Sequence, residues 1–318
     1  MGRSEGVDLL SVRPIDPLAA AEAAEPAPAR RLRFGRRAGP TAGLLSAPIL
    51  WIGLFFVVPV VMIALYSVAG ISGLSPNDLT SYSLIPWKDF LFEGPYMGLF
   101  WKSVRMSTIV SVTSVILAYP VAYLLALVAG RRKYTLLLII IVPFLTSYLL
   151  RVLAFRVILG DQGVINTALE SVGVVDQPVS WLYYSQFAIY LVLSYVWVPF
   201  VALPIFVSLE SMNTQLLEAS SDLGASRLRT FVTVTLPLSI PGVIAAFIFV
   251  FIPTLGEYVT PRLVGGPGGY MFGSAIESAF TAGLDWQFGS AMSMFLVFAV
   301  GVLIVIFGRY LNARAVAE

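Results

Sequence analysis

The sequence predicts an all-α membrane protein with six transmembrane helices and both termini in the cytoplasm. Of its 318 residues, 58% are apolar and 12% are charged, and the mean hydropathy is +0.86, well outside the range of soluble domains. Six apolar runs are each long enough to cross about 30 Å of hydrocarbon, which takes roughly 20 helical residues. The basic residues gather on one side of these runs.

The six apolar runs define the expected spans. Each of the first five contains proline, which removes a backbone donor and tends to kink a helix. Kinked bundles suit a protein that alternates between conformations, although proline is also more frequent in membrane helices generally. In chain order the runs cover residues 44–69, 106–129, 134–153, 187–209, 238–259 and 288–307.

The distribution of Lys and Arg predicts the orientation. Fourteen of the twenty lie in the N-terminal tail, the turn at 131–133, the loop with Arg227 and Arg229, or the C-terminal end, against six near the other face. Cytoplasmic loops hold the excess of basic residues, so we expect that side to be cytoplasmic. The expected segments are a disordered cytoplasmic tail at 1–43, a transmembrane domain at 44–310 with a cytoplasmic loop at 210–237, and a short cytoplasmic tail at 311–318.

The composition excludes most site chemistry. Cysteine and histidine are absent, which excludes disulfides, Cys or His metal sites and histidine-based catalytic triads. None of the three lysines follows a glycine, so the chain has no GxxxxGK[ST] phosphate loop. We expect no catalytic residue, metal or cofactor in this chain, and a net charge of +2 without a basic stripe indicates no nucleic-acid partner.

The stretch EASSDLGASR, at residues 218–227, carries a short amphipathic helix pattern interrupted by one glycine. Asn213 or Thr214 can cap a helix that ends before Gly224, which fits a left-handed C-cap, and Ser226 can cap a second helix. Small side chains leave a low surface that another protein can approach closely. These features alone also fit a plain interfacial helix-turn-helix.

The same stretch resembles the cytoplasmic EAA signature of ABC importer permeases, E-A-A-x3-G-x9-I-x-L-P. The glutamate, alanine and glycine match, whereas Ser220 replaces the second alanine and Val234 the isoleucine. The resemblance implies that the helix before the glycine is a coupling helix, which inserts into a groove of an ATP-hydrolysing subunit. The residues implicated in this coupling are Glu218, Ala219, Ser220, Asp222, Leu223, Gly224 and Ala225.

A second set of motifs resembles spermidine/putrescine-type permeases, and the resemblance covers roughly residues 44–310. The family usually shows asparagine near Ser274 and proline where this chain has Gln287. Both departures weaken any inference about the solute. The matching motifs are Arg151, LGEYVTP at 255–261, LVGG at 263–266, GSAI at 273–276 and Asp285-Trp286.

The resemblance implies a type I ABC importer permease fold in a bacterial inner membrane, with alternating access as the mechanism. Besides membrane lipid, the implied partners are a second homologous permease, two ATPase subunits that bind ATP and Mg, and a periplasmic solute-binding protein. The implied solute is a polyamine such as putrescine or spermidine. Amino-acid derivatives, iron complexes, thiamine and phosphonates stay open as alternatives.

Ionisable and aromatic groups near the outer ends of the spans are the candidates for the solute path, because charges at membrane depth are costly and often functional. A carboxylate suits a cationic amine, and aromatic rings, among them Tyr195 and Phe251, can pack ammonium groups. Snorkelling at the headgroup level and an aromatic belt are the alternatives. The candidates are Glu257, Tyr258, Arg105, Arg151 and Trp197.

Two other classes of protein fit less well. A stand-alone secondary transporter typically contains two internal repeats, and residues 44–153 and 187–307 show no convincing self-similarity. A membrane-embedded enzyme needs a concentrated set of acid, base or metal groups, whereas the carboxylates here are scattered.

Overall fold

A computed structural model of the chain describes residues 46–70 and 82–315, and the tail expected at 1–43 lies outside them. The chain divides into two compact units, Met1–Phe55 and Phe56–Glu318. The described part of the first unit is helical. The second unit contains the packed bundle.

The regular elements of the described residues are helical, apart from an isolated β-bridge between Ala69 and Tyr82. In chain order they are η1 (Gly53–Val57), α3 (Val58–Tyr66), α4 (Ile85–Lys88), η2 (Asp89–Glu93), α5 (Tyr96–Tyr123), η3 (Leu124–Val128), η4 (Gly130–Arg132), α6 (Lys133–Ile141), η5 (Val142–Leu145), α7 (Tyr148–Leu159), α8 (Val164–Ser171), η6 (Ser180–Leu182), α9 (Gln186–Glu210), α10 (Gln215–Asp222), α11 (Arg227–Thr230), η7 (Phe231–Thr235), α12 (Leu236–Leu255), α13 (Val259–Val264), η8 (Pro267–Gly269), α14 (Phe272–Thr281) and α15 (Trp286–Ala315).

The described residues contain five helical stretches that could span a membrane, and the number rises to the expected six if a bent pair of helices is counted as one span. The five stretches are Ser46–Tyr66, Tyr96–Val128, Gln186–Glu210, Arg227–Leu255 and Trp286–Arg309. The bent pair is Gly130–Leu145 with Tyr148–Ser171. Beyond the last span, α15 continues to Ala315 and so includes part of the segment expected as a tail at 311–318.

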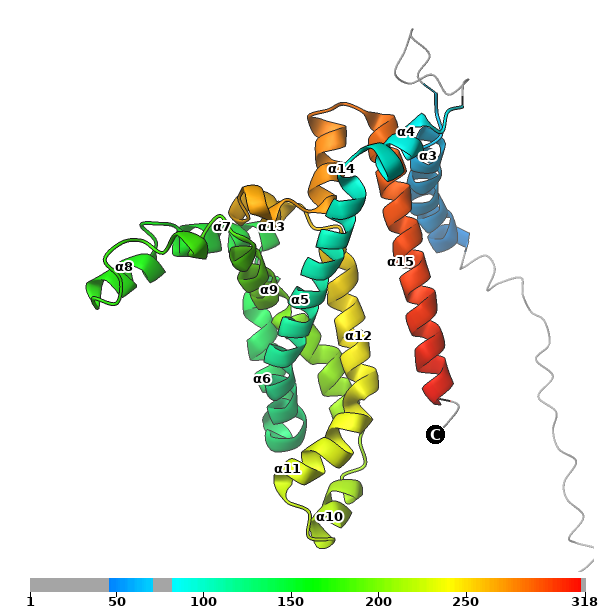
Figure 1. Ribbon diagram of the computed structural model, residues 1–318. Helices are drawn as coiled ribbons and strands as arrows, with labels where there is room; N and C mark the ends of the chain where they lie inside the picture. The colour runs from blue at the N-terminus through cyan, green and yellow to red at the C-terminus, as the bar shows by residue number, and fades with distance from the viewer. Residues whose placement is uncertain (1–45, 71–81, 316–318) are drawn as a thin grey trace, which may run out of the picture. The chain divides into compact units, whose positions relative to one another are not determined.

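The core of the bundle is formed by α5, α9 and α12, which pack along one another (Figure 1). Serine is small, so it lets helices approach closely, and its hydroxyl can bond to a carbonyl of the preceding turn. Ser111 does so, donating to the carbonyl of Ser107 at 2.8 Å. Four serines of α5 are buried in the bundle: Ser103, Ser107, Ser111 and Ser114.

The third span differs from the continuous helix expected at 134–153, because α6 with η5 meets α7 at an angle of 80°. Pro143 lies at the start of η5, where its missing N–H weakens the helix. Thr146 and Ser147 then take extended backbone conformations, with ψ of 157° and 131°. The expected proline kink is therefore a full break in the helix.

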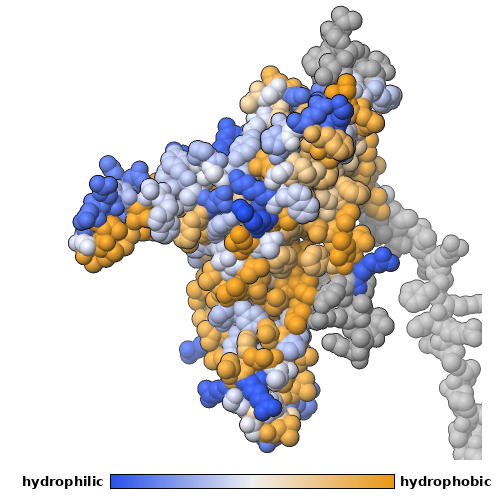
Figure 2. Space-filling view, in the orientation of Figure 1, coloured by the Kyte–Doolittle hydropathy of each residue, from blue (hydrophilic) through white to orange (hydrophobic). Residues whose placement is uncertain are grey.

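Polar residues gather at the two ends of this unit. At one end lie α10 and α11, and at the opposite end lie α4, α8, α13 and α14 (Figure 1). Hydrophilic residues are concentrated toward both ends, among some hydrophobic ones, and the face between them is mostly hydrophobic (Figure 2). Many of the apolar side chains on the spans are exposed, as expected of surfaces that meet lipid or other membrane helices.

Candidate functional site

The helix α10 ends in a turn that requires glycine. Gly224 has φ of +79°, in the left-handed region, as the sequence predicted. Its N–H donates to the carbonyl of Ser221 at 2.9 Å, and the N–H of Ala225 donates to the carbonyl of Ser220 at 3.1 Å. These two bonds are the Schellman pattern that satisfies the last carbonyls of a helix.

Side chains cap the N-terminal ends of both helices in the loop, α10 and α11. The side chain of Asn213, rather than that of Thr214, accepts the N–H of Gln215 at 3.0 Å at the start of α10. At the start of α11, the Ser226 hydroxyl accepts the N–H of Arg229 at 3.4 Å, which confirms the expected cap. The loop is thus a folded helix-turn-helix.

The outer surface of this loop is apolar and hollowed. The side chains of Leu223 and Leu228 are 88% and 73% exposed, and a recess of about 470 Å³ lies beside α10. Of the residues implicated in coupling, Ser220 is buried and Ala225 half-buried, and the other five are exposed. The recess is lined by Leu216, Ala219, Ser220, Leu223, Ala225, Arg229, Thr233 and Val234.

The loop is firmly joined to the bundle behind it. The hydroxyls of Ser220 and Thr230 lie 2.9 Å apart and connect α10 to α11. The ring of Phe231 packs edge-on against Tyr119 and Tyr123 of α5, with centroid distances of 5.7 and 6.0 Å. These contacts therefore connect α10 to α5.

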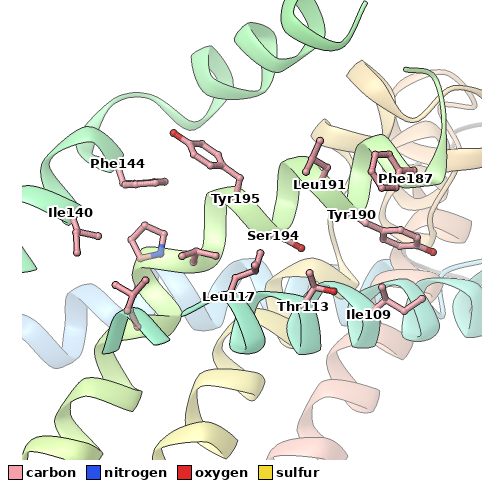
Figure 3. Close-up of a pocket in the computed structure, with 14 residues that line it drawn as sticks. Ile109, Thr113, Leu117, Ile140, Phe144, Phe187, Tyr190, Leu191, Ser194 and Tyr195 are labelled. Atoms are coloured by element: carbon pink, nitrogen blue, oxygen red, sulfur yellow. The ribbon is translucent and has the colours of Figure 1, made fainter. Parts of the chain in front are cut away.

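A cavity of about 660 Å³ lies between α5, α9 and the η5 end of the third span (Figure 3). Its walls are almost entirely apolar. It is lined by Ile109, Thr113, Leu117, Val121, Ile140, Phe144, Phe187, Tyr190, Leu191, Ser194, Tyr195, Val198, Pro199 and Ala202.

A few polar atoms and aromatic rings interrupt this apolar lining. Thr113 of α5 faces Tyr190 and Ser194 of α9 (Figure 3). The Ser194 hydroxyl is buried and has no hydrogen-bond partner within the described residues. At the other end of the cavity the rings of Phe144 and Tyr195 lie 5.3 Å apart. The cavity lining thus contains aromatic rings and a hydroxyl without a partner in the described residues, but no carboxylate.

Arg151 lies beside the Phe144 ring, at the break in the third span. Its Nη2 donates to the carbonyls of Phe144 and Thr146 at 3.3 and 3.4 Å, and its guanidinium lies 5.1 Å from the Phe144 ring centroid. Nε and Nη1 are buried without a partner in the described residues. Arg151 therefore supports the bend and the Phe144 ring, and it does not line the cavity.

Glu257 caps α13 with its side chain. Its Oε1 accepts the N–H groups of Val259 and Thr260 at 2.9 and 3.1 Å, as a carboxylate at a helix N-terminus does. The hydroxyls of Thr260 and Tyr148 lie 2.6 Å apart, which joins α13 to α7. Glu257 is half-buried, and within the described residues it forms no ion pair.

The remaining path candidates do not line the cavity either. Arg105 is exposed on α5 and forms no ion pair within the described residues. Trp197 packs between Phe200 and Phe249, at 6.1 Å from each, and its indole N–H has no partner in this part of the chain. Tyr258 is 44% exposed beside Glu257. Their roles in the solute path stay predictions.

No group of three metal-ligating side chains lies together in the residues that the structure describes.

A family model described as the binding-protein-dependent transport system inner membrane component matches residues 41–316. The chain belongs to this family. It is a multi-pass inner-membrane permease subunit of an ABC importer.

The relatives of this permease agree with that membership. It is 32% identical over 274 residues to the spermidine/putrescine transport system permease protein PotB of Escherichia coli strain K12, and the match covers 84% of this chain and 98% of the relative. A solved bacterial ABC transporter for the acidic polysaccharide alginate contains a chain with TM-score 0.70 and 17% identity, covering 86% of this permease and 95% of that chain. The alginate transporter in complex with its alginate-bound periplasmic protein matches with TM-score 0.62 and 18% identity, over 86% and 94% of the two chains. The ABC importer permease fold expected from the sequence is confirmed, and the relatives are transport subunits rather than enzymes.

The cavity is the part of the permease that the sequence motifs did not reveal. Of its lining residues, the sequence singled out Tyr195 as a ring that can pack ammonium groups. A usable signal was present in α9, where Tyr190 and Ser194 are four residues apart and place two hydroxyls on one face of an otherwise apolar helix. The contribution of Phe144 depends on the bend of the third span.

Proposed function

We propose that this permease forms half of a translocation path for a polyamine, such as putrescine or spermidine, that a periplasmic binding protein delivers. The observation that carries the proposal is the similarity to PotB, a spermidine/putrescine permease, over 98% of that protein's length. A homologous second permease supplies the other half, because one bundle leaves its apolar span surfaces and cavity open.

The chemistry of the cavity supports this solute class. A polyamine alternates methylene segments with ammonium groups. Apolar walls suit the methylenes, the ring faces of Phe144, Tyr190 and Tyr195 suit the ammonium groups, and the Ser194 hydroxyl can accept an N–H. A cavity without a carboxylate binds a cation weakly enough to release it, which a transport path requires.

The orientation of the chain follows from its basic residues. The excess of Lys and Arg assigns the α10 end and both termini to the cytoplasm. The α13 and α14 end lies opposite α10 in the bundle (Figure 1) and so faces the periplasm. Glu257 lies at the periplasmic end of the fifth span with a charge that no basic side chain in the described residues neutralises. It attracts the cationic solute to the mouth of the path, with Tyr258 beside it.

The cytoplasmic loop couples the permease to the ATPase. The exposed Leu223 and Leu228 and the recess beside α10 fit a partner groove, and Gly224 sets the turn between the two helices. ATP and Mg bind to the ATPase subunits, and this chain holds no cofactor. Closure of the ATPase dimer draws the two coupling loops together and turns the cavity toward the periplasm, so the solute meets alternating access.

An anionic solute is the second candidate, because of two specific observations. Arg105 forms no ion pair in the described residues. Two nitrogens of Arg151, beside the Phe144 ring, are buried and have no hydrogen-bond partner in the described residues. Iron complexes and phosphonates are the candidate solutes of this anionic kind. Thiamine and amino-acid derivatives are further candidate solutes. The relatives and solved structures described above are parts of ABC transporters and not stand-alone secondary transporters.

Uptake by the assembled complex tests the proposal. The permease is co-expressed with its second permease and ATPase, reconstituted in liposomes with the binding protein, and given labelled spermidine or an anionic control solute. We expect ATP-dependent spermidine uptake, and an increase in its KM of about tenfold for Ser194→Ala, since a hydrogen bond to a charged group contributes roughly 1.5–3 kcal/mol. Ser293→Ala, on α15 outside the cavity, is the matched control and leaves KM unchanged. Uptake of the anion alone contradicts the polyamine assignment.

A further inference from the structure

Three side chains meet where α9 ends and α6 begins. Tyr134 donates its hydroxyl to Oε1 of Glu210 at 2.6 Å, and the ammonium group of Lys133 pairs with the same oxygen at 2.6 Å. The Lys133 ammonium also lies 5.2 Å from the centroid of the Tyr134 ring. These contacts close a triangle, which we call the Glu210 clamp.

The clamp lies at the base of the coupling loop. Glu210 is the last residue of α9, five positions before Gln215 opens α10. The base at the other side of the loop is Phe231, whose ring packs on Tyr119 and Tyr123 of α5. The two ends of the loop therefore contact two different helices, α6 and α5.

The helix that the clamp holds ends at the cavity. α6 has nine residues, about 13 Å at 1.5 Å per residue, and it runs directly into η5. Ile140 near its end and Phe144 of η5 line the cavity. One end of this rigid segment thus touches the coupling loop, and the other end forms part of the cavity wall.

We propose that Glu210 is a positioning residue for coupling, which transmits the movement of α10 through α6 to Ile140 and Phe144 in the cavity wall. The inference rests on the proposed function of the coupling loop and the cavity. Its physical basis is that two donors converge on a single carboxylate oxygen. The side chains of Lys133 and Glu210 are 27% and 26% exposed, so solvent screens their ion pair only in part, whereas Tyr134 is 56% exposed.

The first test measures how many ATP molecules are hydrolysed per solute imported by the reconstituted complex. Glu210→Gln keeps an acceptor for Tyr134 and removes the charge that pairs with Lys133. We expect the ratio to rise about fivefold or more, the lower range of measured couplings between sites, with the amount of co-purified ATPase unchanged. Exchanging the two charges, Lys133→Glu with Glu210→Lys, restores an ion pair and returns the ratio toward that of the parent.

A matched control comes from the opposite end of the bundle. Lys88 and Glu93 form an ion pair at the same 2.6 Å distance but far from α6, so Glu93→Gln leaves the ratio unchanged. If Glu93→Gln raises the ratio as much as Glu210→Gln does, then the loss of any such charge raises it, and the inference is wrong.

The second test follows the cavity wall itself. The chain contains no cysteine, so Ile140→Cys provides a single reactive thiol in the permease. We expect its rate of modification by a thiol reagent to change between the nucleotide-free and ATP-bound complex, and this change to vanish when Glu210→Gln is added. A response that survives Glu210→Gln overturns the inference.

The outcomes separate the inference from the proposed function. If the parent complex imports no solute or binds no ATPase, the proposed function fails. If the parent complex works and Glu210→Gln either couples normally or loses its ATPase altogether, the clamp has no role in transmission and the inference alone fails.

Discussion

Gly224→Val gives the sharpest prediction about the coupling loop. A Cβ at Gly224 meets no atom within 4 Å, so the substitution changes the backbone preference and nothing else nearby. At φ of +79°, an L side chain costs roughly 1–2 kcal/mol, and more when β-branched. Opening the turn instead forfeits the bonds from Gly224 and Ala225, each contributing about 0.5–1.5 kcal/mol.

Either route makes the docking-competent turn about 1–2 kcal/mol less favourable. If the ATPase binds only the closed turn, its apparent Kd rises by about 5- to 30-fold. The assay titrates labelled ATPase subunits against the permease pair in nanodiscs. Gly224→Asn tolerates the left-handed conformation, so we expect its Kd to stay within about twofold of that of the parent.

Gly173 supplies the matched control, since it has φ of +73° and also no atom within 4 Å of a built Cβ. It follows α8, at the end opposite the coupling loop, so Gly173→Val leaves the ATPase Kd unchanged. The reasoning is refuted if Gly224→Val binds the ATPase as tightly as the parent. It is also refuted if Gly224→Asn weakens binding as much as valine does, because the cause is then contact rather than backbone conformation.

Two further predictions concern charge. Glu257→Gln keeps an acceptor for the N–H groups of Val259 and Thr260 and removes the charge, so spermidine uptake falls about tenfold or more while assembly and basal ATP hydrolysis hold; unchanged uptake contradicts a role for the carboxylate in attracting solute. Arg105→Gln removes a cation that repels a polyamine, so spermidine uptake stays level or rises, and a marked loss instead favours the anionic solute.

Local features of the fold followed from the sequence, because their causes lie within a few residues. The spans follow from hydropathy, and the turn at Gly224 follows from a helix pattern that ends in glycine between small residues. The caps of α10 and α11 also belong to this class. Each of these depends on contacts between residues close together in the chain.

Features that depend on contacts between residues far apart in the chain could not be predicted from the sequence. Pro143 indicated a kink, but the size of the bend is set with Arg151, which binds carbonyls on the other side of the break. The cavity combines three segments far apart in sequence, and the contact between Tyr134 and Glu210 joins residues 76 positions apart. No local pattern encodes such a meeting.

The central claim is that a polyamine passes through the cavity between α5, α9 and η5. Ser194→Cys places the single thiol of the permease inside that cavity, and Ser293→Cys places one on α15 outside it. During turnover with ATP and binding protein, spermidine should slow the modification of the Ser194→Cys thiol several-fold and leave the Ser293→Cys thiol unaffected. Modification of Ser194→Cys at the same rate with and without spermidine, in a complex that is importing it, would contradict the claim.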